Sequence, residues 1–365
     1  MENFYLAALR KANGFTVRFW EKLPADIRDG KMLWDSSYDD LIYLGIPEKM
    51  ATNIYHARKE HPDYPEKLAN ECEKKKINLV SWNDNNYPDI LREIHQPPFI
   101  IFYRGNIEPE ALRIAIVGSR RFTSYGKGVA QSFSQKLAAA GVTVVSGAAR
   151  GIDTAAHMGA LKGGRTVAVM GCGIDIAYPP ENRKMLDEIA ANGAVISEHE
   201  PGTPPLAQLF PARNRIISGL CKGTLVVEAA KRSGSLITAE FALSENRDVF
   251  AIPGSVFSDM SQGCHKLIQN GAKLVSSADD ILEEYHIRNN YAYNRRKNKM
   301  PEMSEEESDI YKLLSFDKPM SVDEIIFAQH GRNDVSNISL TLIQMVVKGI
   351  IIEDDSHGYR RAERE

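Results

Sequence analysis

The alternation of short β-rich runs with amphipathic helical runs between residues 77 and 285 constrains the fold more than any other feature of this sequence. Such an alternation is typical of βαβ units, in which helices cover a mostly parallel sheet. More runs qualify as strands than the about six of an ordinary dinucleotide-binding sheet. We therefore predict an α/β fold with an extended Rossmann-like, mostly parallel sheet, in a domain over residues 75–286. The expected strands are 77–82, 99–103, 113–117, 143–145, 166–170, 194–197, 224–227, 249–252 and 273–275.

The segment before the predicted sheet favours a small helical module. Residues 1–70 contain short helical patterns that glycine and proline interrupt, for example at Gly14, Pro24 and Pro47. Because these residues end helices, we expect several short helices in a SAM-like domain rather than one long helix.

The segment after the predicted sheet divides into a linker and a second module. Residues 287–302 lack apolar periodicity and are rich in arginine and lysine, which is typical of a solvated linker. In residues 303–365, Ser304 and Ser321 each precede a glutamate by three positions, which is the pattern of a capping box. A third helical run ends at Gly349 before an apolar hairpin, and this order predicts a winged-helix domain.

Bulk charge and cysteine spacing narrow the class of protein. The formal net charge of -3 gives no global attraction for a polyanion, so a nucleic-acid site would have to be a local basic patch. The four cysteines lack the C-x-x-C spacing of a zinc site or a redox pair. No signal-peptide pattern occurs at the start, and no window reaches the about 20 apolar residues of a membrane span. We expect a cytoplasmic protein with reduced thiols, no structural metal and no membrane partner.

Two loops that follow predicted strands carry residues suited to an anion. The strand at 113–117 runs into Gly118, Ser119 and Arg120, where a helix is expected to begin. In α/β sheets such a loop binds anions through backbone N–H groups and the helix dipole, and a glycine permits close approach. The next strand leads to a second loop that holds Arg150. Because both loops lie at the carboxyl edge of the sheet, we expect a continuous anion-binding rim.

Two later helix starts add an aromatic ring and further polar groups. An aromatic side chain beside arginines can stack on a base while the arginines pair with phosphates. Capping of the two helices by the same residues is the alternative interpretation. The candidates at these two starts are Phe210, Arg213, Asn214, Arg215, Lys231 and Ser233.

Several enzyme interpretations lack the residues that they need. Arg120 and Thr123 stand where a G-x-G-x-x-G pattern would require glycine, and no Walker-type loop occurs, so no nucleotide cofactor is expected. Cys221 lies in a run that leads from helix to strand, the reverse of a nucleophile elbow. His157 and His199 lack the second half of a metal-binding pattern. The sequence therefore predicts a binding protein rather than an enzyme.

Several long motifs, in order and in register, identify the chain as a member of the DprA (Smf) family by resemblance. They are Ile116–Arg120, Ser146–Asp153, Phe210–Arg215, Ser233–Ala239 and Ile252–Gly254. The resemblance implies a homodimer that binds and protects incoming single-stranded DNA during natural transformation. It further implies that the protein helps to load a RecA-type recombinase and can meet a single-strand DNA-binding protein.

The same resemblance assigns roles to individual positions. Gly118, Ser119 and Arg120 match the family's phosphate pocket, and the segment Arg213–Arg215 matches its arginine-rich helix start. Phe210 matches the aromatic residue that is expected to stack on a base. The N-terminal segment departs from the glycine-rich helix-hairpin-helix sequence of many members, which makes DNA binding there unexpected.

The C-terminal module has the wrong charge for a duplex-binding winged helix. Residues 303–365 contain thirteen Asp or Glu against seven Lys or Arg, and the expected recognition helix, 334–347, contains no basic residue. Because phosphate contacts need such residues, we hypothesise a protein-contact or regulatory role for this module instead.

Two rival functions stay open at this point. One is a nucleotide-processing enzyme of the phosphoribohydrolase type, for which Glu228 at a strand end is the nearest catalytic counterpart, although the P-G-G-x-G-T loop of such enzymes is missing. The other is a scaffold for recombination proteins that does not touch DNA and whose arginines form structural ion pairs.

Overall fold

The computed structural model describes residues 1–365 except 288–302, 317, 330–334, 355–357 and 363–365. The predicted linker therefore lies, apart from residue 287, outside the described residues. None of the described helices is long and apolar enough to cross a bilayer.

The predicted extended sheet is present. Within the described residues, nine strands form one sheet in the order β1-β2-β6-β5-β4-β3-β7-β8-β9. From β6 to β9 the neighbours are parallel, whereas β2 pairs antiparallel with both β1 and β6 at one edge. Each strand lies where the sequence predicts it, with small differences at the ends. The strands are β1 (Asn78–Ser81), β2 (Ile100–Gly105), β3 (Arg113–Val117), β4 (Thr143–Ser146), β5 (Thr166–Met170), β6 (Ala194–Ser197), β7 (Gly223–Val226), β8 (Asp248–Ala251) and β9 (Lys273–Leu274).

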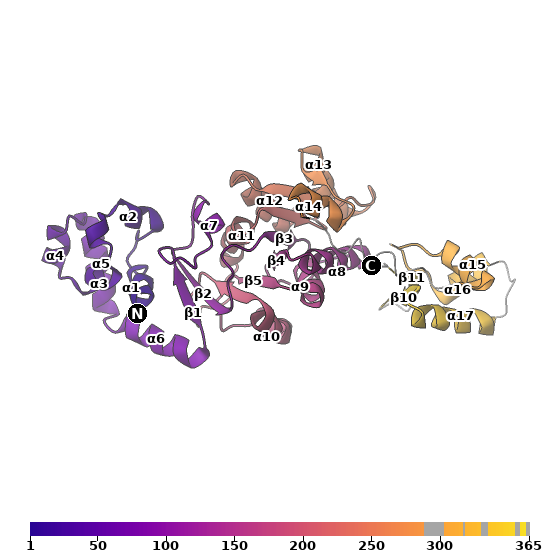
Figure 1. The fold of residues 1–365 in the computed structure, drawn as a ribbon, viewed down its shortest axis with the longest axis horizontal. Coiled ribbons are helices and arrows are strands. Elements are labelled where there is room, and N and C mark those ends of the chain that lie inside the picture. The colour runs from indigo at the N-terminus through magenta and orange to yellow at the C-terminus, as the bar shows by residue number, and fades with distance from the viewer. Residues whose placement is uncertain (288–302, 317, 330–334, 355–357, 363–365) are drawn as a thin grey trace.

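Helices cover both faces of this sheet (Figure 1). Strand residues alternate between two cores: Val145 faces the core that includes α11 and α12, while its neighbour Val144 faces the core that includes α8 and α9. This alternation is expected for a sheet that is buried on both sides. The helices are α7 (Asp89–Arg92), α8 (Ser124–Ala139), α9 (Ile152–Gly163), α10 (Arg183–Asn192), α11 (Leu209–Gly219), α12 (Gly234–Ser244), α13 (Gln262–Gln269) and α14 (Ala278–Glu284).

The N-terminal helices share a hydrophobic core with the sheet. Leu6 and Trp34 belong to the same buried cluster as Met170 of β5 and Val195 of β6. The apolar core is thus continuous between the helical segment and the sheet, although the sequence predicts a separate domain for residues 1–70. The helices are α1 (Glu2–Leu9), α2 (Val17–Lys22), α3 (Gly30–Asp35), α4 (Tyr38–Tyr43), α5 (Glu48–Glu60) and α6 (Tyr64–Lys75).

The C-terminal module has the predicted order of three helices and a hairpin. Both capping boxes are formed, by Ser304 with Glu307 and by Ser321 with Glu324. The module has a core of its own around Ile310, and the third helix carries no charged side chain. Its elements are α15 (Glu305–Leu313), α16 (Val322–Ala328), α17 (Val335–Val347), β10 (Ile351–Glu353) and β11 (Tyr359–Arg361).

Candidate functional site

A pocket of about 690 Å³ lies where the order of the sheet reverses, between β3 and β7. From β3 the chain continues to β4 on one side, and from β7 it continues to β8 on the other side. At such a switch point the loops after the two strands diverge and leave a crevice at the carboxyl ends, which is where open α/β sheets bind ligands. The loops after β3 and β7 and the first turns of α11 and α12 line this pocket.

Folds of this kind usually bind an anion at the first turn of the helix that follows β3, here α8. In this protein a carboxylate of the chain itself already occupies that place. Glu228 follows β7, is buried, and accepts hydrogen bonds from the backbone N–H of Thr123 at 3.0 Å and from its hydroxyl at 2.5 Å. Burial raises the pKa of the Glu228 carboxyl, and both bonds from Thr123 oppose that shift. A phosphate bound at this helix start would therefore meet a buried negative charge of the protein.

Gly118 and Ser119 line the pocket, and both also have roles in the local fold. A Cβ on Gly118 would lie 2.7 Å from the side chain of Ile152, so packing against α9 requires the glycine. The Ser119 N–H donates to the carbonyl oxygen of Glu228 at 2.8 Å, and its hydroxyl accepts from the Arg121 N–H at 3.1 Å. The Ser119 N–H is therefore used within the fold, whereas the Ser119 hydroxyl, which accepts in this bond, keeps its O–H donor for the pocket.

Arg213 is the buried floor of the pocket, with 5% of its surface exposed. Its Nη1 donates to the carbonyl oxygen of Gly147, which directly follows β4, at 2.6 Å. It also donates to the carbonyl oxygen of Val169, the last but one residue of the neighbouring β5. Burial lowers the pKa of the Arg213 guanidinium to about 10, against the opposing effect of Asp153. A Cβ on Gly147 would lie 2.3 Å from Nη1 of Arg213 and 2.7 Å from Oδ2 of Asp153, so only glycine leaves room for these two buried side chains.

An aromatic wall, made of Tyr178 and Phe210, borders the pocket. The two rings lie 5.3 Å apart between centroids, at an angle of 37°. The exposed Arg120 guanidinium lies 5.9 Å from the Phe210 ring centroid, and that of Arg213 lies 6.0 Å away. A half-exposed ring between two cations can stack on a flat group while the cations face an anion attached to it.

The start of α12 forms the opposite side of the pocket. Ser233 caps this helix, and its hydroxyl accepts from the Ser235 N–H at 3.4 Å. Gly234 has open space around the position of a Cβ, and the exposed Arg232 lines the pocket beside it. A helix start with a cation beside it attracts a negative group. The Asn214 amide donates to the Gly234 carbonyl oxygen at 3.5 Å and so links α11 to this turn.

Three of the predicted binding residues do not line the pocket. Arg150 is exposed and pairs with Glu181 at 2.5 Å, and Arg215 is largely buried and pairs with Glu198 at 2.5 Å. Lys231 is exposed next to the pocket without lining it. The pocket thus brings together seven of the ten candidates: Gly118, Ser119, Arg120, Phe210, Arg213, Asn214 and Ser233.

The structure also adds three residues that the sequence analysis did not select. Arg121 and Arg232 line the pocket from the loops after β3 and β7. The sequence shows both cations in these loops, so their positive charge is the signal that identifies them. Tyr178 comes from the loop after β5, and only its place beside Phe210 shows its relevance. Asp153 is the one acidic side chain among the described residues that line the pocket, and it is buried where the charge of Arg213 acts on it.

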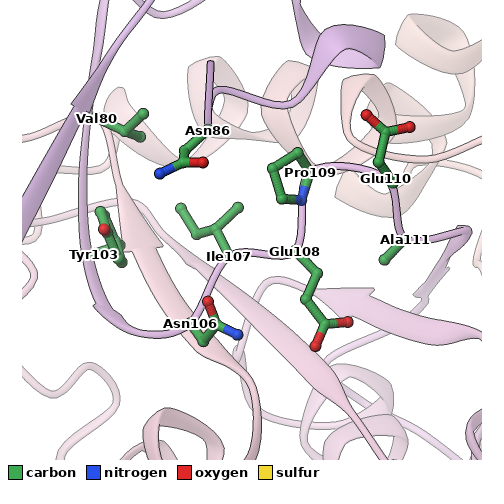
Figure 2. Close-up of a pocket in the computed structure, with 9 residues that line it drawn as sticks. All are labelled: Val80, Asn86, Tyr103, Asn106, Ile107, Glu108, Pro109, Glu110 and Ala111. Carbon is green, nitrogen blue, oxygen red and sulfur yellow. The ribbon is translucent and has the colours of Figure 1, made fainter. Parts of the chain in front are cut away.

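A second pocket, of about 620 Å³, lies before the start of β3 (Figure 2). Val80, Tyr103 and Ile107 form its apolar part, and the carboxylates of Glu108 and Glu110 stand on its other side. Two carboxylates repel a polyanion, so this pocket is unsuited to phosphates. The described residues contain no group of three or more His, Cys, Asp or Glu side chains that could hold a metal ion.

Comparison with known proteins places the chain in a family. The family model described as DNA recombination-mediator protein A matches residues 78–286, which include all of the pocket. This chain belongs to the DNA recombination-mediator protein A family. The resemblance inferred from the sequence motifs is thereby confirmed.

Relatives of this recombination-mediator family show how far the similarity extends. The DNA processing protein DprA of Streptococcus pneumoniae is 50% identical over 206 residues, which are 56% of this chain and 73% of that protein. The DNA processing protein DprA of Bacillus subtilis is 42% identical over 232 residues, 63% of this chain and 78% of that protein.

Solved structures of family members agree with the fold. The X-ray structure of DprA from Streptococcus pneumoniae matches with a TM-score of 0.68 at 38% identity, over 78% of this chain and 98% of that chain. DNA processing protein A from Helicobacter pylori, a structure described for its single-stranded DNA binding mode, matches with a TM-score of 0.53 at 29% identity. That match covers 57% of this chain and 95% of the other.

Proposed function

We propose that this recombination mediator binds single-stranded DNA, without sequence preference, in the pocket between β3 and β7. The observation that carries the proposal is the combination in one pocket of exposed arginines, an aromatic wall and the start of α12. Arg120, Arg121 and Arg232 can meet phosphates, while Phe210 can stack on a base of any kind, because every base has an aromatic face. The single-stranded DNA binding mode described for the Helicobacter pylori relative supports the same assignment.

In this proposal the protein acts as a homodimer in the cytoplasm, protects incoming single strands during natural transformation and helps to load a RecA-type recombinase. Contact with a single-strand DNA-binding protein belongs to the same proposal. Two copies of the pocket on one strand would raise the effective affinity without new contacts in either pocket. The buried position of Glu228, bonded to Thr123, argues against its use as a catalytic group.

The first test is fluorescence anisotropy of a labelled single-stranded oligonucleotide across a salt series, with duplex DNA as competitor. We expect salt-sensitive binding that duplex displaces poorly, because a paired base cannot reach Phe210. Phe210→Leu keeps the apolar volume and removes the ring, so it should weaken binding about tenfold without changing the salt slope. No wild-type binding at low salt would sink the proposal, and release of free base from a nucleoside monophosphate would favour the enzyme interpretation.

Deletion of residues 303–365 should leave the affinity for single-stranded DNA within about twofold, a change too small to represent even one lost phosphate contact. The module has its own core, and the outward face of α17 presents Leu340, Ile343 and Val347 rather than cations. The same anisotropy titration, with the full chain as reference, measures the effect. A tenfold or greater loss would show that the module contributes to DNA binding and would contradict its assignment to other contacts.

A further inference from the structure

The loop from β6 to α11 leads to the aromatic wall, and residues of the N-terminal helical segment contact this loop. Arg10 directly follows α1, and its Nη1 donates to the carbonyl oxygen of Glu198 at 3.0 Å. Lys11 Nζ lies 2.7 Å from the carboxylate of Glu200, above the ring of Tyr64. Both contacts join the helical segment to the loop that ends at Phe210.

The neighbouring loop, which leads from β5 to Tyr178, is held in the same way. Lys75, at the end of α6, lies 2.7 Å from the carboxylate of Asp175. The other oxygen of Asp175 accepts from the Gly202 N–H at 2.8 Å, and the Gly173 N–H donates to the Thr203 carbonyl oxygen at 2.8 Å. One connected set of bonds therefore joins α6 to both loops that supply the aromatic wall.

The chain between these anchors and the pocket is stiff. Pro201, Pro204 and Pro205 lie between Glu200 and the start of α11, and each proline has a fixed φ. At the other end, Glu198 pairs with Arg215 of α11. We therefore expect a shift at Glu198 or Glu200 to reach the first turn of α11, where Phe210 lies.

We propose that Lys11 and Lys75 are positioning residues of the pocket: they hold the two loops so that Tyr178 and Phe210 present one stacking surface to a base. This inference rests on the proposed function and deepens it. Neither lysine lines the pocket, so each acts on the bases of a bound strand through the loops and not on its phosphates. The N-terminal helices thereby contribute to strand binding without touching the strand.

The test compares Lys11→Ala/Lys75→Ala with wild type on two labelled strands of equal length, oligothymidine and an abasic strand with the same phosphates. We expect the double variant to lose about three- to tenfold in affinity for oligothymidine, and less than about twofold for the abasic strand, because stacking exists only on the first. The salt slope should stay unchanged. The matched control is Lys31→Ala/Lys67→Ala, which removes two lysines whose ion pairs join residues four positions apart in the N-terminal segment and do not reach the loops of the sheet.

Each outcome of this comparison decides a separate point. An equal loss on both strands would mean that the lysines act only through their charge. No loss on either strand would mean that the loops keep their positions without the lysines. Either result would overturn the inference. Wild-type protein that binds neither strand would instead overturn the proposed function itself. Unchanged binding by the control variant on both strands is the result that supports a specific role of Lys11 and Lys75.

A charge swap and a DNA-free measurement separate positioning from loss of folding. Lys11→Glu should weaken oligothymidine binding, and Lys11→Glu/Glu200→Lys should restore it, since the exchanged pair can still join helix and loop. Hydrogen–deuterium exchange of residues 198–210 should rise in Lys11→Ala/Lys75→Ala while exchange in α12 stays at the wild-type level. An equal rise in both segments would indicate general destabilisation and would overturn the positioning role.

Discussion

Arg213→Ala should lower the free energy of unfolding by about 3–5 kcal/mol, because it removes the buried cation whose charge offsets that of the nearby buried Asp153 carboxylate. The substitution also removes the bonds from the guanidinium to the carbonyl oxygens of Gly147 and Val169. Burial already raises the pKa of the Asp153 carboxyl, which shows how unfavourable the charge becomes when Arg213 no longer opposes that effect. Urea denaturation followed by circular dichroism measures the change.

The control for this loss is Arg120→Ala, which removes an exposed guanidinium from the same pocket and should alter stability by less than about 0.5 kcal/mol. Arg213→Met/Asp153→Asn removes both charges and should cost less than Arg213→Ala alone. Equal stability of Arg213→Ala and wild type would contradict the buried pair. Because Arg213 supports the fold, a loss of DNA binding in its variants does not by itself identify a DNA contact.

Arg120→Ala/Arg232→Ala should weaken binding of single-stranded DNA about a hundredfold, since each arginine is expected to supply one charge-assisted contact to a phosphate. Both side chains are exposed and line the pocket from two different loops, so the folded structure should persist. The slope of log affinity against log salt should fall by about 1.4, the value for two contacts on a single strand. Anisotropy across the salt series gives both quantities.

The matched comparison is Arg150→Ala/Lys231→Ala, which removes two exposed cations that the sequence predicts as binding residues but that do not line the pocket. We expect this variant to bind within about threefold of wild type, because Arg150 is already paired with Glu181 and an exposed charge that touches no phosphate is screened by salt. A larger loss here than in Arg120→Ala/Arg232→Ala would move the strand path away from the pocket between β3 and β7.

The sequence predicts the sheet well because strand formation leaves a local pattern. Nine short apolar runs bounded by turn residues are visible without any knowledge of contacts, and β1 to β9 lie on them. The capping boxes at Ser304 and Ser321 are equally local, since three residues separate the two partners. Features that depend on a few consecutive residues can be inferred from those residues alone.

The sequence predicts the site less completely because the roles of its residues depend on distant partners. Arg213 and Arg215 are both arginines at one helix start, yet the first is the pocket floor and the second pairs with Glu198. Glu228 accepts hydrogen bonds from the N–H and the hydroxyl of Thr123, which lies more than a hundred positions earlier in the chain. Only the folded chain shows which cations face the pocket and which anion fills the first turn of α8.

The core that α1 and α3 share with β5 and β6 makes strand binding and N-terminal stability parts of one equilibrium. If detachment of the N-terminal helices weakens the hold on a bound strand, the strand binds more tightly while they are docked and shifts the population away from the detached states. DNA held between β3 and β7 would therefore protect residues such as Leu6 and Trp34 from exposure, although they lie in a different segment of the chain.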